Sequence, residues 1–279
     1  MNSEKTPECV VPATLDGWAC LHDLYQVRWT QLHKLSAIEK SALFAETKTF
    51  LQSITSPAKG HSGYFSMLGH KADLMFLHFR ETFDDLNEVE LALRQQPIFE
   101  YLSPTTSYVS IVELGMYAMT QKIFDELIAQ NLKIDSDAWN AAWDERMQDQ
   151  FNRMKGRVFT DIPSDRYICF YPMDKRRGEK YNWYAEPMKD RTQMMFEHGM
   201  VGRKYAGKVQ QIITGSIGFD DWEWGVDLFA KDPKVFKDLI YEMRFDRASA
   251  HYAEFGPFYT GLQFLADEIE PFLQGKLPK

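Results

Sequence analysis

Apolar residues recur along the chain either at every second position, as in strands, or at every third or fourth position, as in helices. In the first half these two patterns predict elements in the order β-α-β-β-α-β. Alternation of apolar and polar residues predicts a strand over 18–29. Apolar residues at helical spacing, introduced by a capping box at Ser36 and Glu39, predict a helix behind it. The remaining elements of this half are a hairpin, a second helix and a strand, predicted over 64–79, 86–93 and 108–112.

The second half repeats this order. Asp73 and Asp221 occupy corresponding turns of the two hairpins, which indicates two copies of one α+β supersecondary unit. Each copy must bury one face of its sheet, so the two copies either pack face to face or close into a barrel. We assign a flexible arm, a first unit, a helical connector and a second unit to 1–13, 14–130, 131–160 and 161–279.

The composition is that of a globular chain with an acidic balance. Of the 279 residues, 44% are hydrophobic and 26% are charged, and the formal net charge is −8. The acidic balance argues against nucleic acid as a partner, because phosphate contacts need clustered Lys and Arg. Apolar runs such as 167–173 are far shorter than the roughly 20 residues of a membrane span. The three cysteines lie far apart and no signal peptide is apparent, so we expect a reduced, cytoplasmic protein.

Candidate chemistry gathers in the second half. His198 stands among apolar residues at helical spacing; such a histidine is more often a core residue, and its functional alternative is an axial ligand of haem iron. The run 175–180 is the densest basic stretch, and it is either a solvated loop or a site for a ligand rich in carboxylates. Tyr171 and Met173 precede this run on one face of the expected strand. No HExxH or Cys-x-x-Cys spacing occurs, so a zinc site is not expected.

Several long stretches, which together span nearly the whole chain, resemble one family. This family is the coproheme decarboxylases, hydrogen peroxide-dependent haem synthases of the chlorite-dismutase-like superfamily. The closest stretches are DRYICFYPMDKRRGEKYNWY (165–184), EHGMVGRKYAGKVQQIITGSIGFDDWEWGVDLFA (197–230) and YEMRFDRASAHYAEFGPFY (241–259). The first half resembles the family more loosely, through LDGWACLHDLYQVRW (15–29) and SYVSIVEL (107–114).

The resemblance implies a fold, a ligand and a reaction. The fold is α+β and chlorite-dismutase-like, with two ferredoxin-like halves that form a dimeric α+β barrel. Only the second half would bind the porphyrin. The subunits would assemble as a homopentamer and make transient contact with the iron-inserting chelatase. The reaction is the oxidative decarboxylation of the propionates at positions 2 and 4 of iron-coproporphyrin III (coproheme) to vinyl groups. It proceeds through a three-propionate intermediate to haem b, with hydrogen peroxide as oxidant and the substrate as its own cofactor.

The resemblance also implies roles for particular residues. His198 matches the axial iron ligand, Tyr171 matches the redox-active tyrosine, and Lys175 matches its proton partner. Further contacts to the substrate fall on Arg157, Met173, Gln211, Arg244 and Ser249. Propionate contacts from the first half have no assigned residues.

Gln211 bears on the choice within the superfamily. Chlorite dismutases carry an arginine at the position that matches Gln211, so chlorite decomposition is disfavoured. Three alternatives stay open. A peroxidase or chlorite-dismutase-like enzyme is the first. A haem carrier or sensor is the second, and it would use His198 but leave Tyr171 and Lys175 without a task. A haem-free ferredoxin-like barrel is the third.

Overall fold

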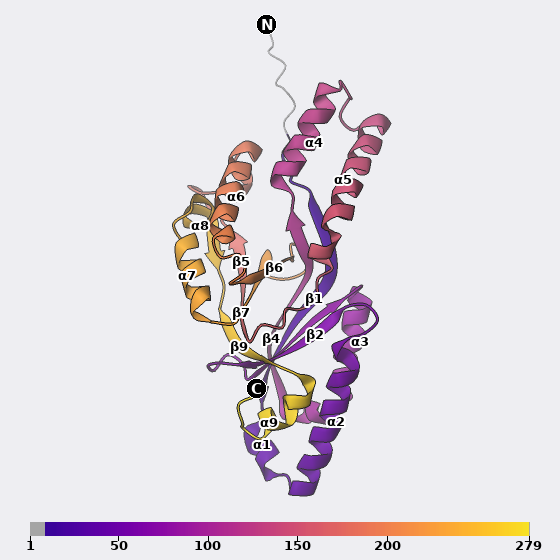
Figure 1. Cartoon of the computed structure of the whole chain (residues 1–279), viewed down its shortest axis with the longest axis vertical. Helices are drawn as coiled ribbons and strands as arrows, with labels where there is room; N and C mark the ends of the chain where they lie inside the picture. Colours follow the sequence, from indigo (N-terminus) through magenta and orange to yellow (C-terminus); the bar gives the residue numbers. More distant parts are fainter. Residues whose placement is uncertain (1–8, 279) are drawn as a thin grey trace.

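The computed structural model describes residues 9–278 and contains one antiparallel sheet that closes on itself (Figure 1). Its strands are β1 (Thr14–Val27), β2 (His61–Met67), β3 (Leu74–Arg80), β4 (Leu102–Gly115), β5 (Tyr167–Lys175), β6 (Gln210–Gly215), β7 (Trp224–Ala230), β8 (Ala253–Phe255) and β9 (Tyr259–Phe264). Its α-helices are α1 (Trp29–Lys34), α2 (Ala37–Thr55), α3 (Phe83–Arg94), α4 (Tyr117–Ala129), α5 (Asp137–Val158), α6 (Met188–Arg203), α7 (Lys234–Met243), α8 (Arg247–Tyr252) and α9 (Ile269–Leu273). Short 3₁₀ turns cover Pro97–Tyr101, Trp183–Ala185 and Ala266–Glu268.

The two halves have the same strand order, which confirms the ferredoxin-like units. The first half runs β4-β1-β3-β2, and the second runs β9-β5-β7-β6. Two seams join them, because β2 pairs with β9 and β4 pairs with β6, both antiparallel. The eight strands therefore form a closed barrel, and β8 continues the edge of β5 beyond β9. Of the two arrangements that the sequence allowed, the chain adopts the barrel.

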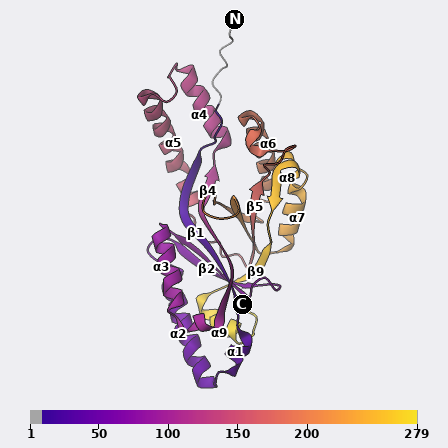
Figure 2. The ribbon, with the colours of Figure 1, turned by 180° about the vertical axis from the view of Figure 1, so that it is seen from behind.

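The interior of the barrel is packed with side chains, and the helices lie outside it. Both halves contribute large buried residues to the interior, among them Leu24, Phe65, Met75, Leu77, Phe79, Phe170 and Phe229. α2 and α3 lie outside the first half, and α6, α7 and α8 lie outside the second (Figures 1 and 2). Because the interior is filled, a large ligand has access only to the outer faces of the sheet.

The helices α4 and α5 form a hairpin that projects from one end of the barrel (Figure 1). The end of α5 lies so close to β1 that a Cβ on Gly17 would overlap the carbonyl oxygen of Val158. The apolar residues of α5 recur at helical spacing; Trp139 and Trp143 pack against α4, and Phe151 and Met154 pack against the barrel. Among residues 9–278, no helix is both long and apolar enough to cross a membrane.

Most predicted elements form, and the differences lie at short segments. The capping box at Ser36 and Glu39 is present at the start of α2, which confirms that prediction. The first strand begins at Thr14 rather than Trp18, and Trp29 opens α1 instead of ending the strand. The short helices α8 and α9 carry too few turns for an apolar period to show. Of the expected flexible arm over 1–13, residues 1–8 lie outside the described part of the chain.

A buried charged pair connects the halves inside the barrel. Nε2 of His22 on β1 lies 2.9 and 3.0 Å from the two carboxylate oxygens of Asp227 on β7, and both side chains are fully buried. The imidazole also stacks on Phe170 at 3.9 Å between ring centroids. Burial would lower the pKa of His22, but the Asp227 carboxylate and the neighbouring Cys20 outweigh it and raise that pKa to about 10.

The thiol of Cys20 completes a line of Cys, His and Asp, with Sγ 3.7 Å from Nδ1 of His22. This line resembles an activated cysteine, yet burial raises the pKa of Cys20. A reactive cysteine needs an accessible thiolate. We therefore interpret the three residues as a structural cluster.

We expect Asp227→Ala to lower the free energy of unfolding by about 3–5 kcal/mol, because it leaves a buried imidazolium without a partner. Denaturant unfolding measures this loss. The matched control is Glu81→Ala, which breaks an exposed ion pair with Lys59 and should change stability by under about 1 kcal/mol. Since the pKa of His22 is raised on folding, its contribution is complete below pH ~6.5 and disappears as the pH rises through about 10. Equal losses for the two variants would contradict this interpretation.

Candidate functional site

One outer face of the second half carries most of the candidate residues. Alternation along β5 places Tyr171, Met173 and Lys175 on the same side of the sheet. Gln211 on β6 pairs with Leu228, which packs in the same cluster as Tyr171, so Gln211 belongs to this face too. The sheet thus presents one wall built from β5, β6 and β7. We call it the candidate wall.

Tyr171 is held firmly within the candidate wall. Its ring stacks on Phe258 with centroids 4.6 Å apart, and it lies 5.7 Å from Phe255. Burial raises the pKa of the Tyr171 hydroxyl above its ordinary value, and the charge of Arg244 only partly offsets this. The phenol is therefore protonated at neutral pH, and any oxidation of it must release a proton.

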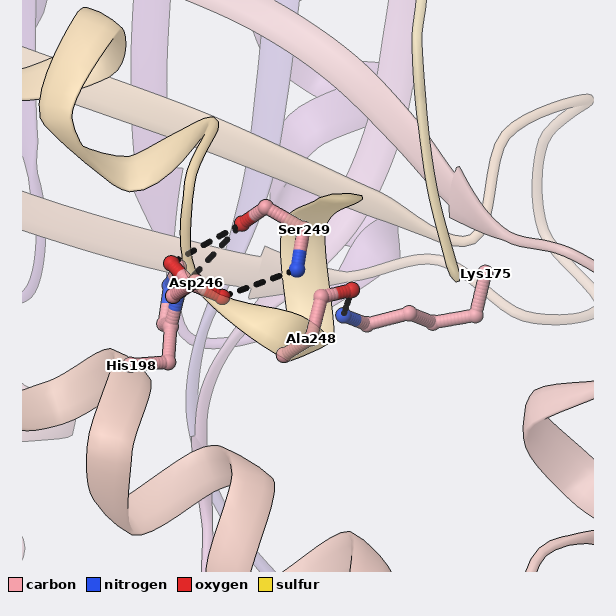
Figure 3. A network of polar contacts seen from close by, with 5 residues as sticks. All are labelled: Lys175, His198, Asp246, Ala248 and Ser249. Carbon is pink, nitrogen blue, oxygen red and sulfur yellow. Dashed lines mark hydrogen bonds and ion pairs between the residues drawn. The ribbon is translucent and has the colours of Figure 1, made fainter. Parts of the chain in front are cut away.

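His198 projects from α6 toward the segment that begins α8 (Figure 3). Its Nδ1 lies 2.9 Å from a carboxylate oxygen of Asp246, the residue that caps α8. The second carboxylate oxygen accepts a 2.8 Å hydrogen bond from the backbone N–H of Ser249. Burial would raise the pKa of Asp246, but the contacts with His198 and Ser249 lower it. A carboxylate at Nδ1 fixes the orientation of the ring and leaves Nε2 as the nitrogen that can ligate iron.

Lys175 ends β5 and extends toward α8 (Figure 3). Its Nζ donates to the carbonyl oxygen of Ala248 at 3.3 Å and lies 4.5 Å from the centre of the Trp183 ring. The side chain is buried, and this burial lowers the pKa of Lys175 to about 8, although Asp246 and Glu223 oppose the shift. An amine with this pKa can both accept and release a proton near neutral pH.

Among residues 9–278, Lys175 and Tyr171 share no hydrogen bond. Met173 lies between them along the strand. A proton that passes from the phenol to the amine would therefore need a bound group between the two.

The remaining expected contacts fall into two groups. Arg244 is the C-cap that follows α7, and its guanidinium lies 3.8 Å from the centre of the Phe255 ring, which in turn packs beside Tyr171. Ser249 is buried, and its hydroxyl donates to Asp246 at 3.2 Å. Both therefore belong to the surroundings of the candidate wall. Arg157 is exposed in the last turn of α5, and the described contacts do not join it to the others.

The residues that sequence reasoning missed are those that hold the expected ones in place. Asp246 orients His198, and Trp183 lies beneath Lys175. The signal for Asp246 was weak, because Asp is a preferred helix N-cap residue but α8 itself was not predicted. Trp183 has no sequence signal beyond its aromatic neighbours.

The donor set fits an anionic iron porphyrin. His198 offers one nitrogen for iron, and no residue within 9–278 forms a hydrogen bond with its Nε2. Lys175 and Arg244 place cationic groups around the same face, and such groups suit the carboxylate substituents of a porphyrin. The wall between them is apolar, which suits the flat face of a macrocycle.

Comparison with known proteins identifies the family of the chain. A family model described as chlorite dismutase matches residues 40–264. A coproheme decarboxylase of Staphylococcus saprophyticus is 42% identical, over 93% of this chain and 96% of its own length. A coproheme decarboxylase of Staphylococcus carnosus is 41% identical, over 94% of this chain and 97% of its own.

Solved structures show the same fold. A heme-binding protein of Thermus thermophilus aligns with a TM-score of 0.81 at 36% identity, over 96% of this chain and all of its own. A chlorite dismutase variant of Candidatus Nitrospira defluvii aligns with a TM-score of 0.70 at 18% identity, over 93% of this chain and 96% of its own. The class of protein is thus a chlorite-dismutase-like α+β barrel.

This chain belongs to the chlorite dismutase family, and its similarity to the two staphylococcal enzymes extends over almost its full length. The resemblance that the sequence motifs suggested is confirmed.

We expect one lysine of the ligand-free protein to titrate near pH 8, because burial disfavours the charged form of Lys175. NMR detection of the lysine Cε resonances over pH 6–11 measures this. Lys175→Met should remove the early transition, whereas Lys59→Met, at an exposed lysine, should leave it in place. If every lysine titrates together near pH 10.4, the amine is not buried in solution.

Proposed function

We propose that this chain catalyses the hydrogen peroxide-dependent decarboxylation of iron-coproporphyrin III to haem b. The observation that carries the proposal is the pairing of a histidine on α6, whose Nδ1 is held by Asp246, with a wall that bears a tyrosine and a buried lysine. Its relatives named coproheme decarboxylase support the same reaction. A carrier would need His198 but would have no use for Tyr171 and Lys175.

The stoichiometry sets what the residues must do. Each propionate loses carbon dioxide, one β-hydrogen and two electrons as it becomes a vinyl group. One hydrogen peroxide accepts the electrons and, with protons, leaves as two waters. The iron of the substrate, once activated by peroxide, supplies the oxidising equivalents. The residues therefore have to anchor the carboxylates, bring one of them to Tyr171 and move protons.

Anchoring falls to cationic and hydroxyl groups. Arg157 and Arg244 present forked guanidinium donors that match a carboxylate, and Ser249 offers a hydroxyl. Met173 faces the same side as Tyr171 and would pack against the reacting edge of the ring. Gln211 would lie above the iron as a neutral amide that neither attracts nor holds an anionic oxidant.

Tyr171 would carry the oxidising equivalent to the propionate. Loss of one electron and one proton from its phenol creates a radical that can take a hydrogen atom from the β-carbon and so regenerate the phenol. The carbon radical that remains gives up a second electron and carbon dioxide, which forms the vinyl group. Lys175 would hold the departing carboxylate and exchange the proton, because its pKa of about 8 suits both tasks.

The proposal extends to assembly and location. We propose that porphyrin binds only to the second half and that the subunits form a homopentamer. Apolar side chains that a subunit interface would cover stand exposed on α6, on α7 and directly after α7, namely Phe196, Met200, Tyr241 and Phe245. A transient contact with the chelatase would use the same class of surface. A cytoplasmic location suits the buried thiols of Cys20 and Cys169.

The central experiment mixes the purified protein with iron-coproporphyrin III, adds peroxide in steps and follows products by mass spectrometry. We expect successive loss of two carboxyl groups through a three-propionate species. Bleaching of the porphyrin without these products would instead identify a carrier or a peroxidase.

Replacement of Tyr171 by Phe keeps the shape and burial of the side chain but removes its oxidisable hydroxyl. We expect Tyr171→Phe to bind iron-coproporphyrin III with nearly wild-type affinity and to form no vinyl product. Soret titration measures binding, and mass spectrometry measures product. Tyr167→Phe, at the start of the same strand, is the matched control and should retain product formation. Haem formation by Tyr171→Phe at a near wild-type rate would assign the radical to another residue.

Binding of the substrate should weaken as the pH rises through about 8. A bound carboxylate favours the charged form of Lys175, so binding takes up a proton that the free protein lacks above its pKa. Affinities at pH 7 and pH 9 for the wild type and Lys175→Met measure the effect. The variant should bind more weakly at pH 7 and lose most of the pH dependence. A pH dependence that persists unchanged in the variant would show that another group is responsible.

A further inference from the structure

A row of residues connects the first half to the candidate wall across five strands, β1, β4, β6, β7 and β5. The cross-strand partners are Asp16 with Glu113, Gly215 with Trp224, and Trp224 with Met173. Directly paired residues of a sheet project to the same side, and Ile111, two residues before Glu113, pairs with Gly215. The whole row therefore lies on the side of the sheet that carries Tyr171, and it ends at Met173.

The side chain of Glu113 extends over β6 through the space that Gly215 leaves by having no side chain. β6 lies between β4 and β7, so a side chain on β4 must pass over β6 to reach β7. A Cβ on Gly215 would overlap Oε2 of Glu113, which means that the carboxylate occupies the space of the missing side chain. From there, Oε1 accepts a 3.3 Å hydrogen bond from the indole N–H of Trp224.

The bond to Trp224 is the interaction that explains the position of this carboxylate. Glu113 is half-buried, and among residues 9–278 it forms no ion pair with a lysine or arginine. Burial raises its pKa, the bond from Trp224 opposes this, and the charge of Asp16 adds to the rise. A carboxylate kept out of water without a cation needs its hydrogen bond.

We propose that Glu113 is a positioning residue: it fixes the indole of Trp224 beside Met173 and so makes the first half contribute to the wall on which the porphyrin rests. This inference rests on the proposed function, since it assigns Trp224 to the porphyrin side of the sheet. Trp224 is half-buried, so part of the ring is available for contact. Without Glu113 the indole N–H of Trp224 would lose its hydrogen-bond acceptor and the side chain would be less ordered. Porphyrin binding would then have to fix the orientation of the indole, which lowers the affinity.

The experiment is a double-mutant cycle on porphyrin affinity, read by Soret titration with iron-coproporphyrin III and with haem b. We expect Glu113→Ala to weaken binding by about fivefold, the effect of one hydrogen bond, and Glu113→Gln to restore most of it through its amide oxygen. In a Trp224→Phe background, which lacks the indole N–H, Glu113→Ala should change affinity by less than about twofold. Asp16→Asn is the matched control, because it removes a carboxylate from the same row that is exposed and does not contact the indole.

Gly215→Ala tests the gap separately. The added methyl group displaces the Glu113 carboxylate, so it should weaken porphyrin binding in the wild type and do so much less in a Glu113→Ala background. Equal effects in both backgrounds would show that the methyl group acts elsewhere.

Tryptophan fluorescence of the ligand-free proteins separates this inference from the proposed function. Glu113→Ala should change the emission of the wild type but not that of Trp224→Phe. If the wild type binds no porphyrin, the proposed function fails, and the fluorescence cycle still decides whether Glu113 positions Trp224. If the wild type binds porphyrin and Glu113→Ala binds it equally well, the positioning role is wrong and the proposed function stands.

Discussion

Closure of the barrel is the constraint that determines where a large ligand can bind. The seams β2–β9 and β4–β6 pair the outer strands of both half-sheets, so the eight-stranded ring has no open edge. The interior is then filled by side chains from both halves, and the His22–Asp227 pair ties β1 to β7 within it. A flat ligand as large as a porphyrin can bind only between an outer face and the helices that cover it. Both halves offer such a face.

The two faces carry different residues at matching positions. Asp23 and Tyr25 hold the same places in the β1–β3 ladder that Tyr171 and Met173 hold in the β5–β7 ladder. In the first half the Tyr25 hydroxyl donates to Asp23, and burial raises the pKa of Asp23 to about 6. Aromatic and aliphatic residues from α2, from the strands and from the C-terminal segment, including Phe272, fill the space above them. Both faces are thus packed against helices, but the positions that hold Asp23 and Tyr25 in the first half hold Tyr171 and Met173 in the second.

Sequence patterns predicted the repeated units and much of the wall because both depend on local regularities. Alternation along β5 sets Tyr171 and Met173 on one side whatever the rest of the chain does, whereas Lys175, expected in the basic loop that follows, is the last residue of the strand. Position in space was harder to predict. Nothing local indicates that β4 of the first half pairs with β6 of the second, and this seam alone brings Glu113 to Trp224. The contact of Asp246 with His198 likewise depends on α8, whose six residues are too few for a helical period to be visible.

The short helix α8 also links the two chemical parts of the site. Its cap, Asp246, orients His198, and the carbonyl oxygen of Ala248, two residues on, accepts the hydrogen bond from Lys175. The charge of Asp246 acts on both, since it lies at the imidazole and also opposes the depressed pKa of the lysine. A shift of α8 would therefore move the His198 ring and the Lys175 amine together. In a chain with a net charge of −8, Lys175 is thus a buried amine for which no ion pair is formed among residues 9–278. It therefore stays available to the anionic ligand that we propose.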